Sequence, residues 1–361
     1  MSEHTNIEWA RHTFNPWVGC TKVGPACDNC YAEGWAKYTG QPELWNGERR
    51  RTTAANWQEP IKWDRKAAAA GVRERVFPSL CDPFDNQVPP RWRDDLWHRI
   101  DQTPNLDWLL LTKRPGNIAK MLPNPETGVR PWGNGWPNVW LGVSAGTQKD
   151  ADRNIPILLA TAARIHFVSL EPLLELIDLT RIKLNSGMTF NALKGGEVAS
   201  GSSVTYWHPL DLVIAGGETG PRARPMHPAW LRSLRDQCVA ARKSFYFKRW
   251  GRWAPVSALD DEAIESIYHP APKRDPEATR VCKVASHVLH VDGSQHDIVE
   301  PMAFAIGKGA MTMYRVGPRA AGRKLDGRTW SQMPETRLQR QTGNDPAASR
   351  SHQDAALNVT P

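Results

Sequence analysis

Long apolar runs and a secretion signal are both missing from this 361-residue chain. No apolar run approaches the roughly 20 residues that a membrane-spanning helix needs, so we expect no membrane partner. The N-terminus reads Met-Ser-Glu-His-Thr-Asn and has neither the basic start nor the apolar stretch of a signal peptide. The sequence therefore predicts a cytoplasmic protein.

Cysteine is scarce as well, and its distribution argues against a disulfide framework. Three of the six cysteines fall between positions 20 and 30, unlike the dispersed, even set of a secreted scaffold. In a reducing compartment such a cluster favours metal binding. The other three, Cys81, Cys238 and Cys282, stand alone in apolar or strand-like surroundings, and we expect them to be packed thiols.

The charge balance is basic. The chain has 46 Lys and Arg against 38 Asp and Glu, a net charge of +8, which favours anionic partners without identifying one. It also has 17 tryptophans, whose rings can fill a core or stack on bases. We expect most of them to be structural.

The apolar pattern predicts an α/β fold. Short runs rich in β-branched and aromatic residues alternate with stretches of helical spacing, as in βα units around a parallel sheet. We expect a partial TIM-like (β/α)6 barrel with irregular insertions and a C-terminal extension. The expected strands lie near 76–81, 107–112, 139–144, 164–170, 211–215 and 244–248, and the expected helices near 28–38, 91–102, 115–121, 148–161 and 228–242.

Three polar or glycine-rich segments, 122–138, 180–208 and 255–315, interrupt this alternation, and we expect them to be insertions that face the substrate. The expected division is a barrel over 1–254, a mixed β and loop segment that closes it over 255–335, and a disordered basic and polar tail over 336–361.

Six residues separate the first two clustered cysteines, Cys20 and Cys27, and two residues separate Cys27 from Cys30. Thiolates at this spacing can bind one metal centre. One candidate is a [4Fe–4S] cluster whose fourth iron, lacking a protein ligand, binds S-adenosylmethionine (SAM) and leads to a 5′-deoxyadenosyl radical. The alternatives are a zinc site, with Cys81 or His12 as fourth ligand, or three unrelated structural thiols.

The motifs around these cysteines resemble those of the phage-associated three-Cys-motif family, a divergent branch of the radical SAM enzymes. The resemblance spans about residues 5–335 without the insertions. It rests on FNPWVGCTK at 14–22, CDNCYAE at 27–33, LTKRP at 111–115, LGVS at 141–144, LEPLL at 170–174, GGETG at 216–220, FKRWG at 247–251 and AAGRKLDGRTW at 320–330.

This resemblance implies a radical SAM barrel with a [4Fe–4S] cluster on Cys20, Cys27 and Cys30, SAM as cofactor, and an electron donor such as flavodoxin or ferredoxin. It also implies the host cytoplasm as location if a phage encodes the chain. One departure concerns spacing, because most radical SAM enzymes place three residues between the first two cysteines and an aromatic just before the third. Here Asn29 holds that place, and Tyr31 is the candidate to contact the adenine.

Polar or glycine residues follow the expected strands, and in a βα barrel these strand ends form the rim of the active site. We expect them to supply the charged and hydroxyl partners that SAM needs, although structural ion pairs are an equal alternative. The candidates are Thr112, Lys113, Arg114, Ser144, Glu171, Gly216, Gly217 and Glu218.

The cluster Lys248, Arg249 and Trp250 pairs two cations with an aromatic ring, which suits a phosphate and an unpaired base. Arg319, Arg323, Lys324 and Arg328 could extend it, and a solvated basic face is the alternative. Some members of the resembled family act in thymine hypermodification of viral DNA, which implies an isomerase for glycinyl-thymidine. Rival hypotheses are a zinc-stabilised, non-catalytic nucleic-acid-binding protein, or a radical SAM enzyme for tRNA, a nucleotide or a peptide.

Overall fold

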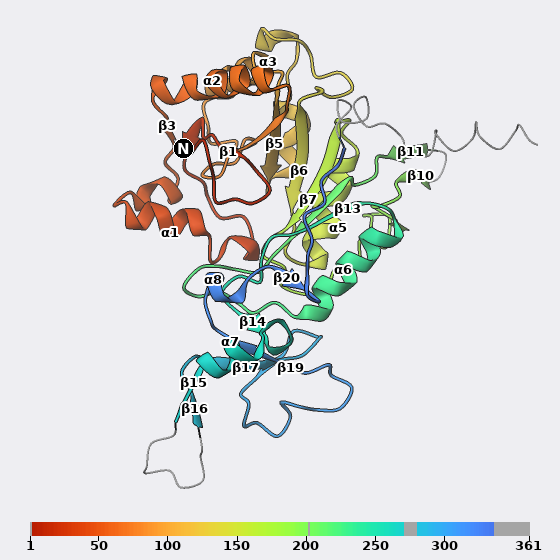
Figure 1. Cartoon of the computed structure of the whole chain (residues 1–361). Helices are drawn as coiled ribbons and strands as arrows, with labels where there is room; N and C mark the ends of the chain where they lie inside the picture. The colour runs from red at the N-terminus through yellow and green to blue at the C-terminus, as the bar shows by residue number, and fades with distance from the viewer. Residues whose placement is uncertain (1, 201–202, 271–279, 336–361) are drawn as a thin grey trace, which may run out of the picture.

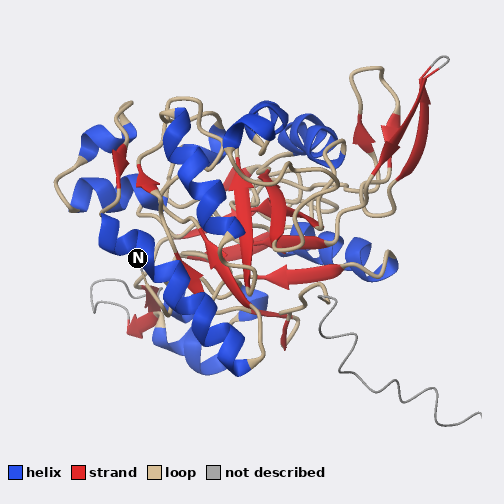
Figure 2. Cartoon of the chain, turned by 90° about the horizontal axis from the view of Figure 1, so that it is seen from above, coloured by secondary structure: helices blue, strands red, loops and turns tan. Residues whose placement is uncertain are grey.

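A parallel sheet of seven strands, curled into a half-barrel, is the centre of the computed structural model, which describes residues 2–200, 203–270 and 280–335. Helices surround the strands when the chain is viewed from above (Figure 2). The strand order follows the sequence: β1 (His12–Thr13), β4 (Glu74–Phe77), β5 (Leu106–Thr112), β6 (Val139–Ser144), β7 (Ile165–Leu170), β12 (Leu212–Ala215) and β13 (Ser244–Phe247).

The predicted α/β fold is thereby confirmed, and so are all six predicted strands. The sheet also has a seventh strand, β1, which the sequence analysis missed because two residues are too short to carry an alternating pattern. It pairs in parallel with β4, with His12 opposite Val76. This pairing places the chain segment that leads into the cysteine motif beside the end of β4.

Helices α2, α3, α5 and α6 cover the outside of the sheet. All five predicted helices are present, whereas α2 was not predicted, although Thr53 caps its first turn and Trp57, Trp63 and Ala67 share its buried face. The helices are α1 (Tyr31–Tyr38), α2 (Ala54–Ala70), α3 (Pro90–Asp101), α4 (Ile118–Met121), α5 (Gln148–Leu159), α6 (Pro228–Ala240), α7 (Asp261–Ser266) and α8 (Pro318–Ala321), with 3-10 turns at η1 (Pro25–Cys27), η2 (Pro42–Trp45), η3 (Pro115–Asn117), η4 (Pro125–Thr127) and η5 (Val256–Ala258).

Alternate strand residues pack on the inside of the curl, where they form a separate apolar cluster. Trp9 from the N-terminal segment closes this cluster, with its ring 4.4 Å from that of Phe77. Gly142 leaves room for the Phe167 ring, because a β-carbon there would lie 2.3 Å from that ring. The interior is therefore filled by side chains, and open space is left at one end of the strands.

The remaining segments form small antiparallel sheets. The described residues of 255–315 form short hairpins, loops and helix α7, and β15 and β16 project from the body (Figure 1). The strands are β2 (Trp17–Val18) with β3 (Arg50–Arg51); β8 (Ile182–Lys183) with β9 (Thr189–Phe190); β10 (Gly196–Ser200) with β11 (Ser203–Trp207); β15 (Tyr268–Pro270) with β16 (Arg280–Cys282); β20 (Lys324–Leu325) with β21 (Arg328–Thr329); and the sheet β14 (Ala254–Pro255), β19 (Met311–Tyr314), β17 (Ser286–Leu289) and β18 (Gln295–His296).

The expected disordered tail at 336–361 lies outside the described residues. Within the described ranges, no helix has the length and apolar character that a membrane crossing requires.

Candidate functional site

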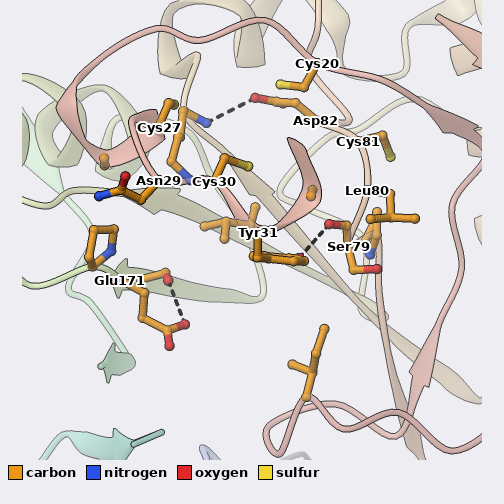
Figure 3. A pocket seen from close by; sticks show the side chains of 18 of the residues that line it. Cys20, Cys27, Asn29, Cys30, Tyr31, Ser79, Leu80, Cys81, Asp82 and Glu171 are labelled. Atoms are coloured by element: carbon orange, nitrogen blue, oxygen red, sulfur yellow. Dashed lines mark hydrogen bonds between the residues drawn. The ribbon is translucent and has the colours of Figure 1, made fainter. Parts of the chain in front are cut away.

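A cavity of about 440 Å³ lies at the carboxyl ends of the parallel strands. All three cysteines of the motif line it, and Figure 3 shows them beside Tyr31, Asp82 and Glu171. Most of the expected rim residues line it too: Thr112, Lys113, Arg114, Glu171, Gly217, Glu218, Lys248 and Arg249. The structure thus brings together, in one cavity, residues that are more than 220 positions apart in the sequence.

The position of Cys20 depends on the glycine before it. Gly19 has φ of 125°, a conformation that L side chains rarely adopt, and a β-carbon there would lie 2.5 Å from the Glu48 carbonyl oxygen. The Gly19 amide donates to the Leu80 carbonyl at 3.1 Å, and the Cys20 amide donates to the Leu44 carbonyl at 2.9 Å. Any other residue at position 19 would push Cys20 out of this place.

Asn15 joins the same segment to the end of β4. Its side-chain oxygen accepts a hydrogen bond from the Leu80 amide at 2.6 Å, and its carbonyl accepts one from the Thr52 hydroxyl at 2.8 Å. Two residues on, the Trp17 ring is fully buried. The contacts of residues 15–19 therefore hold this segment in place, and they position Cys20 next to the strand that leads to Cys81.

Cys27 and Cys30 lie on either side of a tight turn. Cys27 ends η1 and is 8% exposed, and Cys30 stands immediately before α1. Cys81 lines the same cavity, so four free thiols share it. A second zinc-ligand candidate, His12, lies elsewhere, since its ring stacks on Trp63 at 4.4 Å and its Nε2 donates to Glu74.

The thiols share a cavity without forming a closed ligand set. Among the described residues, no three His, Cys, Asp or Glu side chains lie close enough together to hold a metal ion. The donor atoms are of the type that binds iron–sulfur clusters, because three free thiols of one short loop line the same cavity. To bind a cluster, residues 20–30 would have to move so that these sulfur atoms come closer to one another.

Arg114 contacts the cysteine motif directly. Its Nη1 donates to the Cys20 sulfur at 3.5 Å and to Asp82 at 3.0 Å, and its Nη2 donates to the Thr21 carbonyl at 2.8 Å. Burial raises the pKa of the Cys20 thiol, Asp82 raises it further, and Arg114 opposes both. Without a metal this thiol therefore keeps its proton at neutral pH, and metal binding must displace that proton.

A second buried ion pair lies next to Arg114, whose Nε is 3.9 Å from the Asp85 carboxylate. Arg49 donates to Asp85 at 2.6 Å, and both side chains are almost wholly buried. Burial by itself lowers the pKa of Arg114, but Asp82 and the neighbouring anions outweigh it and raise the pKa. The sequence analysis missed Arg49 and Asp85, because each lies outside the motifs and nothing local marks it as buried.

Most cations of the cavity wall are already paired. Lys248 lies 3.1 Å from Glu171, Arg249 pairs with Glu8, and Arg114 pairs with Asp82. Lys22 likewise pairs with Glu33. Within the part of the chain that the structure describes, the Lys113 side chain has no hydrogen-bond or carboxylate partner, although its backbone amide donates to Asp82. Its ammonium group is therefore free to meet a ligand.

Glu218 fastens the cysteine loop to the end of β12. Only 7% exposed, its carboxylate accepts hydrogen bonds from Asn29 at 3.0 Å and from the Arg224 amide at 2.7 Å. The Arg224 side chain also reaches the Pro25 carbonyl at 2.9 Å. Glu218 lines the cavity, but its oxygen atoms already have partners, so its observed role is to hold the loop.

The glycine pair before Glu218 serves close backbone packing. A β-carbon at Gly217 would lie 2.0 Å from the Trp250 carbonyl oxygen, and one at Gly216 would lie 2.8 Å from the Glu171 carboxylate. Gly217 lines the cavity, whereas Gly216 does not. Gly217 is therefore required where the ends of β12 and β13 approach each other, whereas the short contact of Gly216 is with the flexible Glu171 side chain.

Two other expected site residues lie away from the cavity wall. Ser144 is buried behind it, and its carbonyl accepts a hydrogen bond from Asn154. Trp250 is 2% exposed, and its indole N–H donates to the Lys324 carbonyl at 2.9 Å. The Trp250 ring thus packs in the core and has no free face for a base, which corrects the expectation of a stacking surface there.

Tyr31 and Thr112 do line the cavity, in different ways. Tyr31 is 50% exposed and its hydroxyl donates to the Ser79 carbonyl at 2.6 Å, so its ring is held across the cavity (Figure 3). Thr112 is buried, and its hydroxyl oxygen accepts from the Arg114 amide. The opposite wall is largely apolar and includes Trp9, Phe77 and Leu111.

Comparisons with known proteins give one match. No curated protein and no solved structure matches the chain. A family model described as "Protein of unknown function (DUF5131)" matches residues 4–334, which covers every residue of the cavity wall. The chain belongs to this DUF5131 family.

Proposed function

We propose that the protein is a radical SAM enzyme built on a TIM-like half-barrel, with a [4Fe–4S] cluster on Cys20, Cys27 and Cys30. The observation that carries this proposal is that three free thiols of one loop line the same cavity as the polar ends of the parallel strands. Such strand ends are where barrel enzymes place their active sites. The motif resemblance adds the identity of the cofactor.

The chemistry that a bound cluster would supply is one-electron cleavage of SAM to a 5′-deoxyadenosyl radical, with an electron from a flavodoxin- or ferredoxin-type donor. The chain's own residues would bind and orient the reactants. Lys113 offers an unpaired ammonium group for the SAM carboxylate. The Tyr31 ring, which lines the cavity, would contact the adenine, and the apolar side chains of Trp9 and Phe77 would exclude water.

For the substrate, we propose a modified thymidine in phage DNA, glycinyl-thymidine, which the enzyme isomerises. The net charge of +8 and the resemblance support this assignment. A target base would have to leave the helix to enter a cavity of this kind. The same site with tRNA, a free nucleotide or a peptide as substrate is the second enzymatic candidate.

One observation favours a rival of another class. Cys81 lines the cavity with the three motif cysteines, and four thiols are the ligand set of a structural zinc site. A zinc-stabilised nucleic-acid-binding protein would use all four thiols and would have no catalytic activity.

Metal analysis after anaerobic purification and reconstitution separates the two. We expect about four irons and four sulfides per chain in the wild type. Replacing Cys20, Cys27 or Cys30 with serine should lower the iron content severalfold. Cys282→Ser is the matched control, because Cys282 is a free thiol in β16 that does not line the cavity.

Cys81→Ser distinguishes the two metals directly. The three-cysteine cluster predicts that this variant keeps its iron, since Cys81 is not a ligand. One zinc per chain, no iron in the wild type, and loss of that zinc in Cys81→Ser would reject the enzyme proposal.

A further inference from the structure

The residues expected to bind nucleic acid already have partners in the structure. Lys248 and Arg249 each pair with a carboxylate, and the Trp250 ring is buried. If a DNA strand crosses the cavity mouth, the charges that hold its phosphates must therefore come from other residues.

Three arginines gather around residues 219–221 at the edge of the cavity. Arg252 donates from Nε to the Thr219 carbonyl at 3.4 Å, and Arg315 donates from Nη2 to the Pro221 carbonyl. Arg222 is the next residue along and is exposed. Thr219 itself lines the cavity, whereas the three arginines lie outside its lining. These three side chains are here called the basic rim.

The three arginines come from three separate segments of the chain. Arg222 lies between β12 and α6, Arg252 follows β13, and Arg315 follows β19. Arg252 and Arg315 contact carbonyl groups that are two residues apart, within about 7 Å along the chain, so both guanidinium groups lie on the same short segment. The fold, not a run of basic sequence, creates the basic rim, which is why no motif marks it.

The charges of the basic rim are not neutralised within the described ranges 2–200, 203–270 and 280–335. None of the three guanidinium groups has a carboxylate within ion-pair distance there, whereas the neighbouring Arg224 contacts both Glu218 and Asp28. Like charges held near one another repel, so an anion with several negative groups would be favoured at this place. Planar guanidinium groups with spare donors match phosphate oxygens well.

We propose that the basic rim binds the phosphodiester backbone of DNA and holds one strand across the mouth of the cavity. Contacts of this kind fix position without reading sequence. They would present a base to the cavity, next to Lys113 and the cysteine loop. The choice of DNA as the polynucleotide rests on the proposed function, while the phosphate-binding role rests on the charges alone.

The test is the salt dependence of DNA binding, measured by fluorescence anisotropy with a labelled single-stranded oligonucleotide. Each phosphate contact adds roughly 0.7 to the slope of log K against log salt for single strands. Replacing Arg222, Arg252 and Arg315 together with glutamine should therefore lower the slope by about 2, and should weaken binding at least tenfold at low salt.

The matched control is Arg65→Gln, Arg91→Gln and Arg181→Gln combined. These arginines are exposed, have no carboxylate partner within the described residues, and do not line the cavity. The control makes the same change in net charge, so its slope should stay within about 0.5 of the wild type. A third variant with lysine at all three rim positions keeps the charge and should restore most of the slope.

Equal losses in the glutamine and control variants would overturn the proposal, and so would no measurable binding of DNA by the wild type. Tighter binding of an RNA of the same sequence would overturn the assignment to DNA. Formation of 5′-deoxyadenosine by the wild type is measured separately without DNA. It reports on the proposed function whether or not the rim binds phosphate.

Discussion

At the scale of single residues, Lys113 is distinctive because it lines the cavity and its ammonium group has no acid partner in the described part of the chain. The other cations of the wall illustrate the contrast, since Arg114 and Lys248 each have a carboxylate at hydrogen-bonding distance. A ligand carboxylate would supply the missing partner. Among the wall cations, Lys113 is therefore the one whose replacement should affect ligand binding most directly.

Replacing Lys113 with glutamine should weaken SAM binding about tenfold or more, because a hydrogen bond between charged groups contributes roughly 1.5–3 kcal/mol. Equilibrium dialysis with the reconstituted protein measures this. Binding of 5′-methylthioadenosine, which lacks the carboxylate, should not change. Lys120→Gln is the control, since Lys120 is exposed on α4 and does not line the cavity. An equal loss for both ligands would contradict the assignment.

The sequence predicted those site residues that a local pattern marks, and it missed those whose roles depend on tertiary contacts. The cysteines, Lys113 and Glu171 could be predicted because they follow strand ends or share a spacing. The burial of Trp250 could not be predicted, because it depends on the Lys324 carbonyl, 74 positions away. Arg49, Asp85 and Arg224 were missed for the same reason, since only tertiary contacts give them their roles near the cavity.

At the scale of elements, the cavity depends on how closely the ends of β12 and β13 approach. Gly217 donates its amide to the Arg249 carbonyl at 3.0 Å and leaves no space for a side chain. The sequence analysis assigned this glycine to the cofactor, whereas its observed contacts are with the neighbouring strand end.

Gly217→Ala should lower the free energy of unfolding by about 1–3 kcal/mol, because its β-carbon would overlap the Trp250 carbonyl. Urea unfolding followed by fluorescence measures the change. Gly116→Ala is the control, since a β-carbon there meets nothing within 4 Å and its φ is not positive. Equal stabilities of the two variants would show that the packing at β12 and β13 is looser than described.

Strand prediction succeeded where apolar runs were long enough to be read. The β5 run Leu106–Thr112 is buried almost throughout, as a central parallel strand requires. The shortest strand of the seven-stranded sheet, β1, and the alanine-rich helix α2 carried weaker patterns. Their positions depend on pairing with β4 and on packing of Trp57 and Trp63, which only the folded chain shows.

At the scale of the whole molecule, a curled parallel sheet is filled on its inside by apolar side chains and leaves a cavity at the carboxyl ends of its strands. The α/β class could be predicted from the alternation of strand and helix patterns alone. The basic rim could not, because it combines three distant segments. We propose that the cysteine loop at this end of the sheet serves SAM chemistry.

The most direct test of that claim is the formation of 5′-deoxyadenosine from SAM by the reconstituted, dithionite-reduced protein, quantified by mass spectrometry under anaerobic conditions. We predict that the wild type and Cys282→Ser form this product at comparable rates, and that Cys27→Ser forms none above background. No product from wild-type protein that carries about four irons, or equal product from Cys27→Ser, would contradict the account.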